Sequence, residues 1–195
     1  MVIGITGSFG TGKSFVASVF RSLGAKVVDA DRMAHEVIRK GTPEYRRIVK
    51  GFGKNILTGR GEIDREKLGE VVFSDVALLR KLTGIVHPEV IRKIRRSVEA
   101  AGKKDIVVID APLLIEANLS KLIDKLVVVK CSKRRQIERC QEKFCLQKKE
   151  ILRRIRNQMP LSKKLKMADI VIDNSLTKAH TKKQVRKVWR EELWK

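Results

Sequence analysis

Five short runs of apolar, mostly β-branched residues recur along the chain, each about as long as a strand. Most are apolar at nearly every position, which is typical of strands in a parallel sheet covered on both faces. The runs lie at residues 2–6, 25–29, 106–110, 126–129 and 170–172. Because amphipathic stretches separate them, the pattern predicts an α/β fold whose sheet is built from crossover units.

Helical spacing of apolar residues marks several of the intervening stretches. Residues 13–23 and 88–101 each place their apolar side chains on one face, and we expect Pro88 at the start of the second helix. Residues 177–195 predict one basic C-terminal helix. Its inward-facing side chains are expected to be Val185, Val188 and Trp189.

Two intervals are too long to be simple crossovers. Residues 33–101 contain turn signals at Gly41-Thr42-Pro43 and Gly59-Arg60-Gly61, and we interpret them as a helical insert. Residues 133–165, here termed the basic interval, form a second helical stretch that is dense in Lys and Arg. The remaining residues, 1–32, 102–132 and 166–195, are expected to form the sheet core.

The first run leads into a phosphate-binding motif. Gly7-Ser8-Phe9-Gly10-Thr11-Gly12-Lys13-Ser14 matches G-x-x-x-x-G-K-[ST], with a strand before it and a helix after it. Glycines let main-chain N–H groups surround a phosphate, and the helix N-terminus adds positive potential. We expect ATP to contact Gly10, Thr11, Gly12, Lys13, Ser14 and Phe15. Lys13 would reach the β- and γ-phosphates, and the Ser14 hydroxyl would bind Mg²⁺.

Carboxylates end two further runs. Asp110 follows four apolar residues, at the position where P-loop enzymes hold a second Mg²⁺ ligand, although a turn or cap residue is also common there. Asp29 and Asp31 flank the end of the second run. One of them is expected to position an acceptor hydroxyl. Alternatively, Asp29 ends the strand and Asp31 caps the next helix.

Charge and composition narrow the choice of partner. The chain has 44 Lys+Arg against 22 Asp+Glu, so its net charge of +22 favours anionic ligands, with a heavily charged solvated surface as the simpler alternative. Three cysteines suit reduced thiols in the cytoplasm, and no run approaches a membrane span or a secretory leader. Nothing in the pattern sets an oligomeric state.

A P-loop alone does not distinguish a kinase from a GTPase, a motor or a DNA-acting ATPase. The short chain, the helical insert and the basic interval favour a small-molecule kinase. The insert would hold the acceptor, and the basic interval would act as a lid that excludes water. Aromatic residues make up only 5% of the chain, so we expect no specific nucleic-acid binding.

Six elements in order resemble the dephospho-CoA kinase family over nearly the whole chain. They are Ile3–Gly7 with the P-loop, Val27-Val28-Asp29-Ala30-Asp31, Ile85-Val86-His87-Pro88, Asp110-Ala111-Pro112-Leu113-Leu114-Ile115-Glu116, Arg154 with Gln158, and Ala168-Asp169 with Ile172-Asp173-Asn174. The resemblance implies a P-loop kinase fold with a five-stranded parallel sheet, a helical CoA-binding insert and a helical lid. It also implies transfer of the ATP γ-phosphate to the ribose 3′-hydroxyl of dephospho-CoA.

The resemblance further implies roles for individual residues. Asp31 would be the general base, and His87, Leu113 and Glu116 would border the acceptor. Arg139 and Arg154 would stabilise charge on the transferring phosphoryl group, and Asp173 and Asn174 would lie near the adenine. Simpler alternatives are that His87 caps a helix or fills a pocket, and that the two arginines belong to a solvated basic face.

The chain also departs from the family pattern. Ser8 and Phe9 stand where the family usually has glycine and a smaller aliphatic residue, and Lys143 replaces a lid arginine. A lysine lacks the bidentate fork of arginine, so the role of this position is open. Two other functions are weighed against the first: a kinase for another nucleoside or nucleotide hydroxyl, and a nucleic-acid-binding ATPase.

Overall fold

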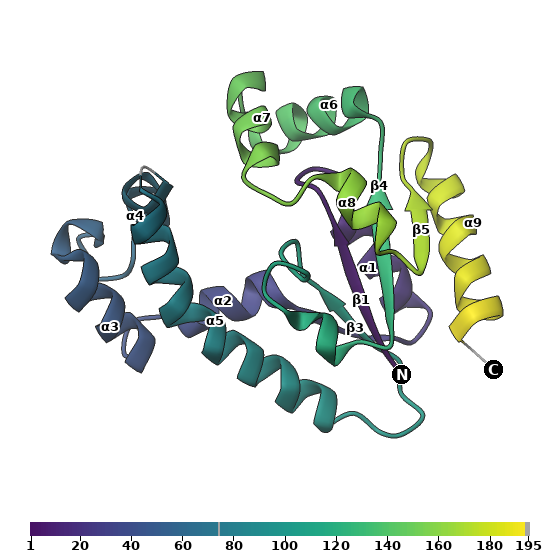
Figure 1. The fold of residues 1–195 in the computed structure, drawn as a ribbon, viewed down its shortest axis with the longest axis horizontal. Helices are drawn as coiled ribbons and strands as arrows, with labels where there is room; N and C mark the ends of the chain where they lie inside the picture. Colours follow the sequence, from purple (N-terminus) through teal and green to yellow (C-terminus); the bar gives the residue numbers. More distant parts are fainter. Residues whose placement is uncertain (74, 194–195) are drawn as a thin grey trace. The chain divides into compact units, whose positions relative to one another are not determined.

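The apolar runs form a five-stranded parallel sheet, as expected. The computed structural model describes residues 1–73 and 75–193 (Figure 1). The strands are β1 (Val2–Gly7), β2 (Lys26–Asp29), β3 (Val107–Asp110), β4 (Lys125–Lys130) and β5 (Ile170–Asp173). Their spatial order is β2-β3-β1-β4-β5, and every pairing is parallel. The five predicted strands are therefore confirmed.

Both faces of β1 are covered, which explains why its sequence is so apolar. Ile3 and Ile5 are fully buried in a core shared with α1 (Lys13–Ser22) and α9 (Lys178–Val188). On the alternate positions, a Cβ at Gly4 would collide with Leu114. Thr6 donates a 3.0 Å hydrogen bond to the carbonyl oxygen of Pro112. Successive side chains of a strand point to opposite faces, so the pattern fits a sheet with helices and loops on both sides.

The C-terminal helix packs as its pattern predicts. Val185 and Trp189 are buried, and Val188 packs against the same core. The Trp189 ring lies 6.3 Å from the ring of Phe20 in α1. After Val188 the chain continues as a π-helical turn, η3 (Trp189–Leu193), and the last two predicted helical residues, 194–195, lie outside the described residues.

The basic interval is helical. It contains α6 (Lys133–Phe144) and α7 (Lys148–Arg156), and α8 (Leu161–Lys166) ends just beyond it. The Ser132 hydroxyl accepts a hydrogen bond from the Arg135 N–H and so caps the first turn of α6. Figure 1 shows α6 leaving the carboxyl end of β4, the edge of a parallel sheet where ligands bind. A short 3₁₀ turn, η2 (Leu119–Leu122), precedes β4.

The chain divides into two compact units, here called the sheet unit (Met1–Asp29 and Ser97–Lys195) and the helical unit (Ala30–Arg96). The helical unit contains α2 (Ala30–Val37), α3 (Pro43–Phe52), η1 (Lys54–Ile56), α4 (Arg65–Phe73) and most of α5 (Val76–Glu99). Its core consists of Ile48, Ile56, Leu68, Val72 and Ile85. Thr42 caps α3 through a hydrogen bond from the Tyr45 N–H, and Pro43 takes the first helical position, where proline is favoured.

The predicted helix start at Pro88 is wrong. α5 begins twelve residues earlier, at Val76, and Pro88 lies inside it. A proline inside a helix costs about 3 kcal/mol because it removes one main-chain hydrogen bond and crowds the preceding turn. The turns before it nevertheless stay helical. Leu78, Leu79 and Leu82 are partly buried against the core of the helical unit, and full burial of such a side chain would contribute about 1.5–3 kcal/mol.

Within residues 1–73 and 75–193, no helix is both long enough and apolar enough to cross a membrane.

Candidate phosphate-binding site

The P-loop has the backbone conformation that its glycines permit. Gly10 and Gly12 have φ values of 79° and 88°, in the left-handed region that side chains other than glycine adopt at a cost. Gly12 immediately precedes α1 and acts as its N-cap. A Cβ at Gly12 would also collide with the side-chain amide of Asn174. Both positions therefore require glycine, as the motif implies.

Lys13 is held at the loop and not in the apolar core. Its side chain is buried, and Nζ donates a 3.2 Å hydrogen bond to the carbonyl oxygen of Ser8. The Thr11 hydroxyl donates to the same oxygen at 2.9 Å. Ser14 is exposed in the first turn of α1, whereas the Phe15 N–H donates to the Gly12 carbonyl and so belongs to the helix.

Two carboxylates lie next to each other at the carboxyl end of the sheet. Asp29 ends β2, Asp110 ends β3, and the two residues are register partners. Asp110 is also the register partner of Ile5 in β1, and it is buried. An acid at this position suits a metal ion bound to phosphates, because Mg²⁺ takes one or two carboxylates and keeps its other ligands from water and substrate.

Asp31 belongs to the helical unit. It is exposed and lies in the first turn of α2, which begins at Ala30, so Asp31 is not the helix cap that the sequence allowed. A carboxylate in a first turn is favourable because it faces the positive end of the helix dipole. The boundary between the two units falls between Asp29 and Ala30, two residues from this candidate base.

Arg139 in α6 carries an unsatisfied donor next to the P-loop. Its Nη1 atom is buried and has no hydrogen-bond partner among the residues that the structure describes. The same atom lies 3.6 Å from the point where a Cβ on Gly12 would stand. Buried guanidinium N–H groups are normally paired, so this one fits an anion such as a phosphate oxygen.

Further positive charges gather around α6. Burial raises the pKa of the Cys140 thiol, and the charges of Arg154, Lys13 and Lys143 oppose that rise. Arg154 pairs with Glu150, with 3.0 Å between Nε and Oε1, and its Cζ atom lies 5.4 Å above the centre of the Phe9 ring. Lys143 Nζ lies 5.1 Å from the centre of the Phe144 ring.

Asp173 and Asn174 lie at the end of β5, and both have protein partners. The Asn174 amide donates to the carbonyl oxygen of Thr11 at 2.9 Å and accepts a hydrogen bond from the Thr181 hydroxyl at 2.8 Å. Asn174 thereby joins β5 and α9 to the P-loop. Hydrogen bonds from Ser175 and the charge of Lys130 lower the pKa of the Asp173 carboxyl, although burial opposes that shift.

Glu116 is engaged by residues that the sequence did not single out. Lys164 in α8 is fully buried, and its Nζ lies 2.9 Å from Glu116 Oε1 and 2.7 Å from the Pro112 carbonyl oxygen. The Met159 N–H donates to the same Glu116 oxygen at 3.0 Å. A buried lysine needs such partners because an isolated buried charge is costly. Leu113, three residues earlier, is exposed.

His87 lies in α5 within the helical unit. It is half-buried, and burial lowers the pKa of its imidazole. The neutral form therefore dominates at neutral pH. Because α5 starts at Val76, His87 is not at a helix start, and the capping alternative is wrong.

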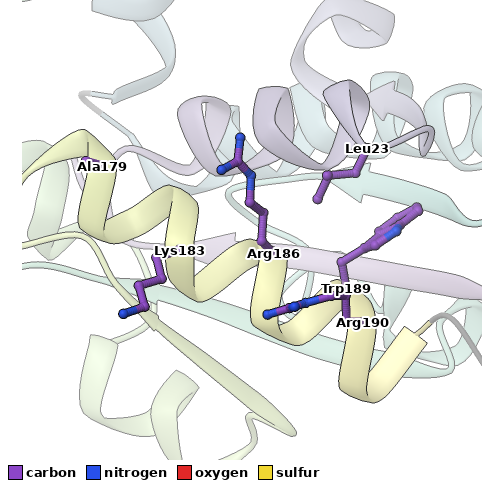
Figure 2. A pocket seen from close by; sticks show the side chains of 6 residues that line it. All are labelled: Leu23, Ala179, Lys183, Arg186, Trp189 and Arg190. Carbon is purple, nitrogen blue, oxygen red and sulfur yellow. The ribbon is translucent and has the colours of Figure 1, made fainter.

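A separate cavity of about 500 Å³ lies beside α9, on the sheet unit. Figure 2 shows its six lining residues. They are Leu23, Ala179, Lys183, Arg186, Trp189 and Arg190. The side chains of Lys183 and Arg186 point in different directions, so the cations do not converge on one point as they do around a phosphate. None of the predicted site residues lines this cavity.

Known proteins resemble this chain along its whole length. The dephospho-CoA kinase family model matches residues 1–180. A dephospho-CoA kinase from Carboxydothermus hydrogenoformans is 40% identical, with 100% of this chain and 95% of the relative covered.

Two solved structures share the fold. A protein from Thermus thermophilus has a TM-score of 0.86 at 31% identity, covering 99% of this chain and 97% of that one. The dephospho-CoA kinase from Campylobacter jejuni has a TM-score of 0.72 at 28% identity, covering 97% and 96%. Together with the P-loop and the parallel sheet, these matches show that the chain belongs to the dephospho-CoA kinase family.

Proposed function

We propose that this protein transfers the γ-phosphate of ATP to the ribose 3′-hydroxyl of dephospho-CoA, giving coenzyme A and ADP. Family membership over residues 1–180 supports the acceptor. The P-loop supports the phosphate donor. The observation that carries the donor site is the buried, unpaired Nη1 of Arg139 beside Gly12, because it provides a donor for an anion at the phosphate cradle.

The residues of the P-loop fit a nucleoside triphosphate. Main-chain N–H groups of Gly10, Thr11, Gly12, Lys13 and Ser14 would surround the phosphates, and Phe15 would follow them in α1. Lys13, Arg139 and Arg154 would neutralise charge that develops on the transferring phosphoryl group. Ser14 and Asp110 would hold Mg²⁺, which would supply charge neutralisation on the phosphates.

The acceptor side follows from the family pattern. Asp31 would accept the proton of the 3′-hydroxyl, and His87 and Leu113 would border the acceptor. Residues 33–101 would form a CoA-binding insert. The contacts of Glu116 with Lys164 and Met159 favour a role in holding that border in place over direct binding. Asp173 and Asn174 would lie near the adenine.

The basic interval, residues 133–165, would close over the phosphates and exclude water as a competing nucleophile. This role suits its position after β4 and the contacts that α6 and α7 make with the P-loop. We place the protein in the cytoplasm, where ATP and the acceptor are available, and where its three free cysteines stay reduced.

An acceptor comparison tests the proposal. ATP consumption is measured with dephospho-CoA, adenosine or AMP, and the product is identified by mass. We expect turnover with dephospho-CoA to exceed the other two by at least about 10²-fold, since a site that hydrogen-bonds its substrate rejects analogues strongly. Faster turnover with adenosine or AMP would replace the proposed acceptor.

Two variants link that activity to the P-loop. Lys13→Ala should lower turnover by about 10²–10³-fold, the loss typical of removing one donor aimed at developing charge. Lys50→Ala removes an exposed lysine from the helical unit and is the matched control. Equal activity of Lys13→Ala and Lys50→Ala, with both folded, would remove the P-loop from the reaction.

A further inference from the structure

Both main-chain polar groups of Phe9, the third residue of the P-loop, are bound by glutamine side chains. Gln136 Nε2 donates to the Phe9 carbonyl oxygen, and the Phe9 N–H donates to Gln158 Oε1 at 2.8 Å. Gln136 belongs to α6 and is only 5% exposed, and Gln158 follows the end of α7. Two separate segments of the basic interval therefore hold one residue of the P-loop.

The chemistry of the main chain sets the orientation of both amides. A carbonyl oxygen only accepts a hydrogen bond, so the group of Gln136 that faces it must be the NH₂. A main-chain N–H only donates, so the group of Gln158 that faces it must be the oxygen. Gln136 is thus a hydrogen-bond donor and Gln158 a hydrogen-bond acceptor, and exchanging donor for acceptor at either residue would break its contact with Phe9.

Further contacts seat the same segments on the P-loop. The ring of Phe144, the last residue of α6, stacks on the Phe9 ring with centroids 5.4 Å apart. Arg154 in α7 lies over the Phe9 ring, and a Cβ at Gly10 would collide with the Cys140 sulfur. An aromatic pair contributes about 0.5–1.5 kcal/mol, and an exposed cation–π contact contributes about 0.5–1 kcal/mol.

The residue after Gln158 is anchored to the sheet. The Met159 N–H donates to Glu116, which also pairs with the buried Lys164. Lys164 in turn reaches the Thr6 hydroxyl at 3.4 Å, in the strand that leads into the P-loop. The anchored residue that follows Gln158 therefore helps to hold its side-chain carbonyl against the Phe9 N–H.

Phe9 precedes the turn at Gly10, where φ becomes positive and the chain enters the phosphate cradle. We propose that Gln136 and Gln158 are positioning residues that hold the Phe9 backbone, and so couple the seating of the basic interval to the shape of the cradle. Coupling of this kind is reciprocal, so a phosphate in the cradle favours the seated interval, and the seated interval strengthens phosphate binding. The proposal rests on the proposed function only in taking the ligand to be a nucleotide phosphate.

A pair of charge-matched variants tests it. Gln136→Glu removes the donor and sets a carboxylate against the Phe9 carbonyl, whereas Gln158→Glu keeps an oxygen that accepts the Phe9 N–H. Both add one negative charge beside the same residue. Gln141 is exposed on α6, so Gln141→Glu adds the same charge there and is the control. The readout is the equilibrium dissociation constant of ADP, with kcat and both KM values alongside.

We expect Gln136→Glu to weaken ADP binding by about 30-fold, Gln158→Glu by about 3-fold and Gln141→Glu by less than about 2-fold. The order follows because Gln136→Glu loses its hydrogen bond to Phe9, whereas Gln158→Glu keeps an acceptor for the Phe9 N–H. In turnover, the KM for ATP should rise more than the KM for dephospho-CoA. An equal or larger effect of Gln158→Glu compared with Gln136→Glu would overturn the proposal.

Gln136 is buried, so a second variant protects the test against misfolding. Gln136→Met keeps the length and removes the donor without adding charge, and we expect about 5-fold weaker ADP binding with a melting temperature near that of the wild type. Unchanged ADP affinity in folded Gln136→Met would also overturn the proposal. ADP binding does not need the acceptor. If the variants weaken ADP binding as expected but the protein fails to phosphorylate dephospho-CoA, only the proposed function is refuted.

Discussion

The sheet unit buries polar as well as apolar side chains, whereas the helical unit buries apolar ones. Among the described residues, every buried polar or charged side chain belongs to the sheet unit: Thr6, Ser8, Thr11, Lys13, Asp110, Gln136, Lys164, Asn174 and Thr181. The helical unit, over residues 30–72 and 75–96, buries only apolar side chains. A buried polar group without a partner costs about 2–7 kcal/mol, so burying so many requires a network that pairs them.

The difference reflects the hydrogen-bonded side chains that surround the P-loop in the sheet unit. In the sheet unit, the buried polar residues bond to one another and to the P-loop backbone, as Asn174 does with Thr11 and Lys13 with Ser8. In the helical unit, the candidate functional side chains, Asp31 and His87, are exposed and half-buried, outside the apolar core. Substitutions of buried polar residues in the sheet unit should therefore act through lost pairing, and substitutions in the core of the helical unit through lost volume.

The largest effect is expected for Asp31→Asn. Asparagine keeps the size of the side chain but cannot take the proton of the acceptor hydroxyl, and general-base catalysis contributes about 10²–10⁴-fold. We predict a loss of kcat in that range, with ADP affinity and melting temperature nearly unchanged because Asp31 is exposed. Steady-state kinetics with dephospho-CoA measure it.

Asp29→Asn is the matched variant, since Asp29 ends β2 and belongs to the sheet unit. It should lower kcat less than Asp31→Asn does. If Asp29→Asn were the more damaging of the two in folded protein, the general base would be Asp29, which belongs to the sheet unit, and not Asp31 in the helical unit.

The Glu116–Lys164 pair tests the pairing rule directly. Glu116→Ala leaves the fully buried Lys164 without its carboxylate, and such a change destabilises by about 3–5 kcal/mol. The partly exposed Glu116 side chain favours the lower end of that range. Adding Lys164→Met should restore most of the stability, because the buried charge is removed and the Thr6 hydroxyl still donates to Pro112. Chemical denaturation of the single and double variants measures both effects.

Ile48→Ala is the counterpart in the helical unit. Ile48 is fully buried, and the lost volume should cost about 2–5 kcal/mol. No removal of a partner can repair it, in contrast to Glu116→Ala. Failure of Lys164→Met to rescue Glu116→Ala would mean that the sheet unit also depends on packing volume at this position.

A smaller effect is expected from the pH dependence of the helical unit. Burial lowers the pKa of His87, so between that lowered pKa and the ordinary value of 6.5 the unfolded chain binds more protons than the folded one. Stability should therefore be full above about pH 6.5 and fall as the pH drops below it. His87→Asn should flatten this slope in denaturation curves between pH 5 and 7.

The exposed His180 provides the control, as His180→Asn should leave the slope in place. A slope that survives His87→Asn would assign the pH dependence to another group.

The smallest effect concerns the end of α6. Cys145 forms its C-cap with φ of 52°, a left-handed conformation in which glycine is the favoured residue. Cys145→Gly should stabilise the protein by about 0.5–1 kcal/mol, since relief of strain outweighs the added freedom of the unfolded chain. Cys145→Ala removes the thiol and keeps the strain, and a gain of equal size from Cys145→Ala would contradict the explanation.

Helix boundaries show where local pattern was a poor guide. Proline at residue 88 indicates a helix start when read locally, yet α5 runs through it, because partly buried leucines about two to three turns earlier pack against the core of the helical unit. The cost of a proline inside a helix, about 3 kcal/mol, was outweighed by the burial of several side chains. The free energy of that burial depends on which residues pack against them. The helix at the C-terminus, in contrast, has its apolar positions where the periodicity placed them.

The candidate site divides in the same way. The P-loop motif is contiguous, so its glycines, Lys13 and the helix that follows could be recognised from residues 7–14 alone. Gln136 and Lys164 could not, because in the sequence they are polar residues in a stretch dense with charge. Gln158 is part of the family resemblance, but its contact with Phe9 does not follow from the sequence. Only their contacts with Phe9, Pro112 and Glu116 mark Gln136 and Lys164 as buried partners.

The amino-acid sequence by itself determined the strands, the phosphate motif and the family, because these depend on near neighbours in the chain or on motifs in a fixed order. The tertiary structure alone decided which polar side chains are buried and what they bind. The contacts of Phe9 with Gln136 and Gln158 join residues more than a hundred positions apart. A hydrogen bond requires two groups within about 3 Å in the right direction. No periodicity along a chain specifies that geometry, which is set when the sheet and its covering helices pack.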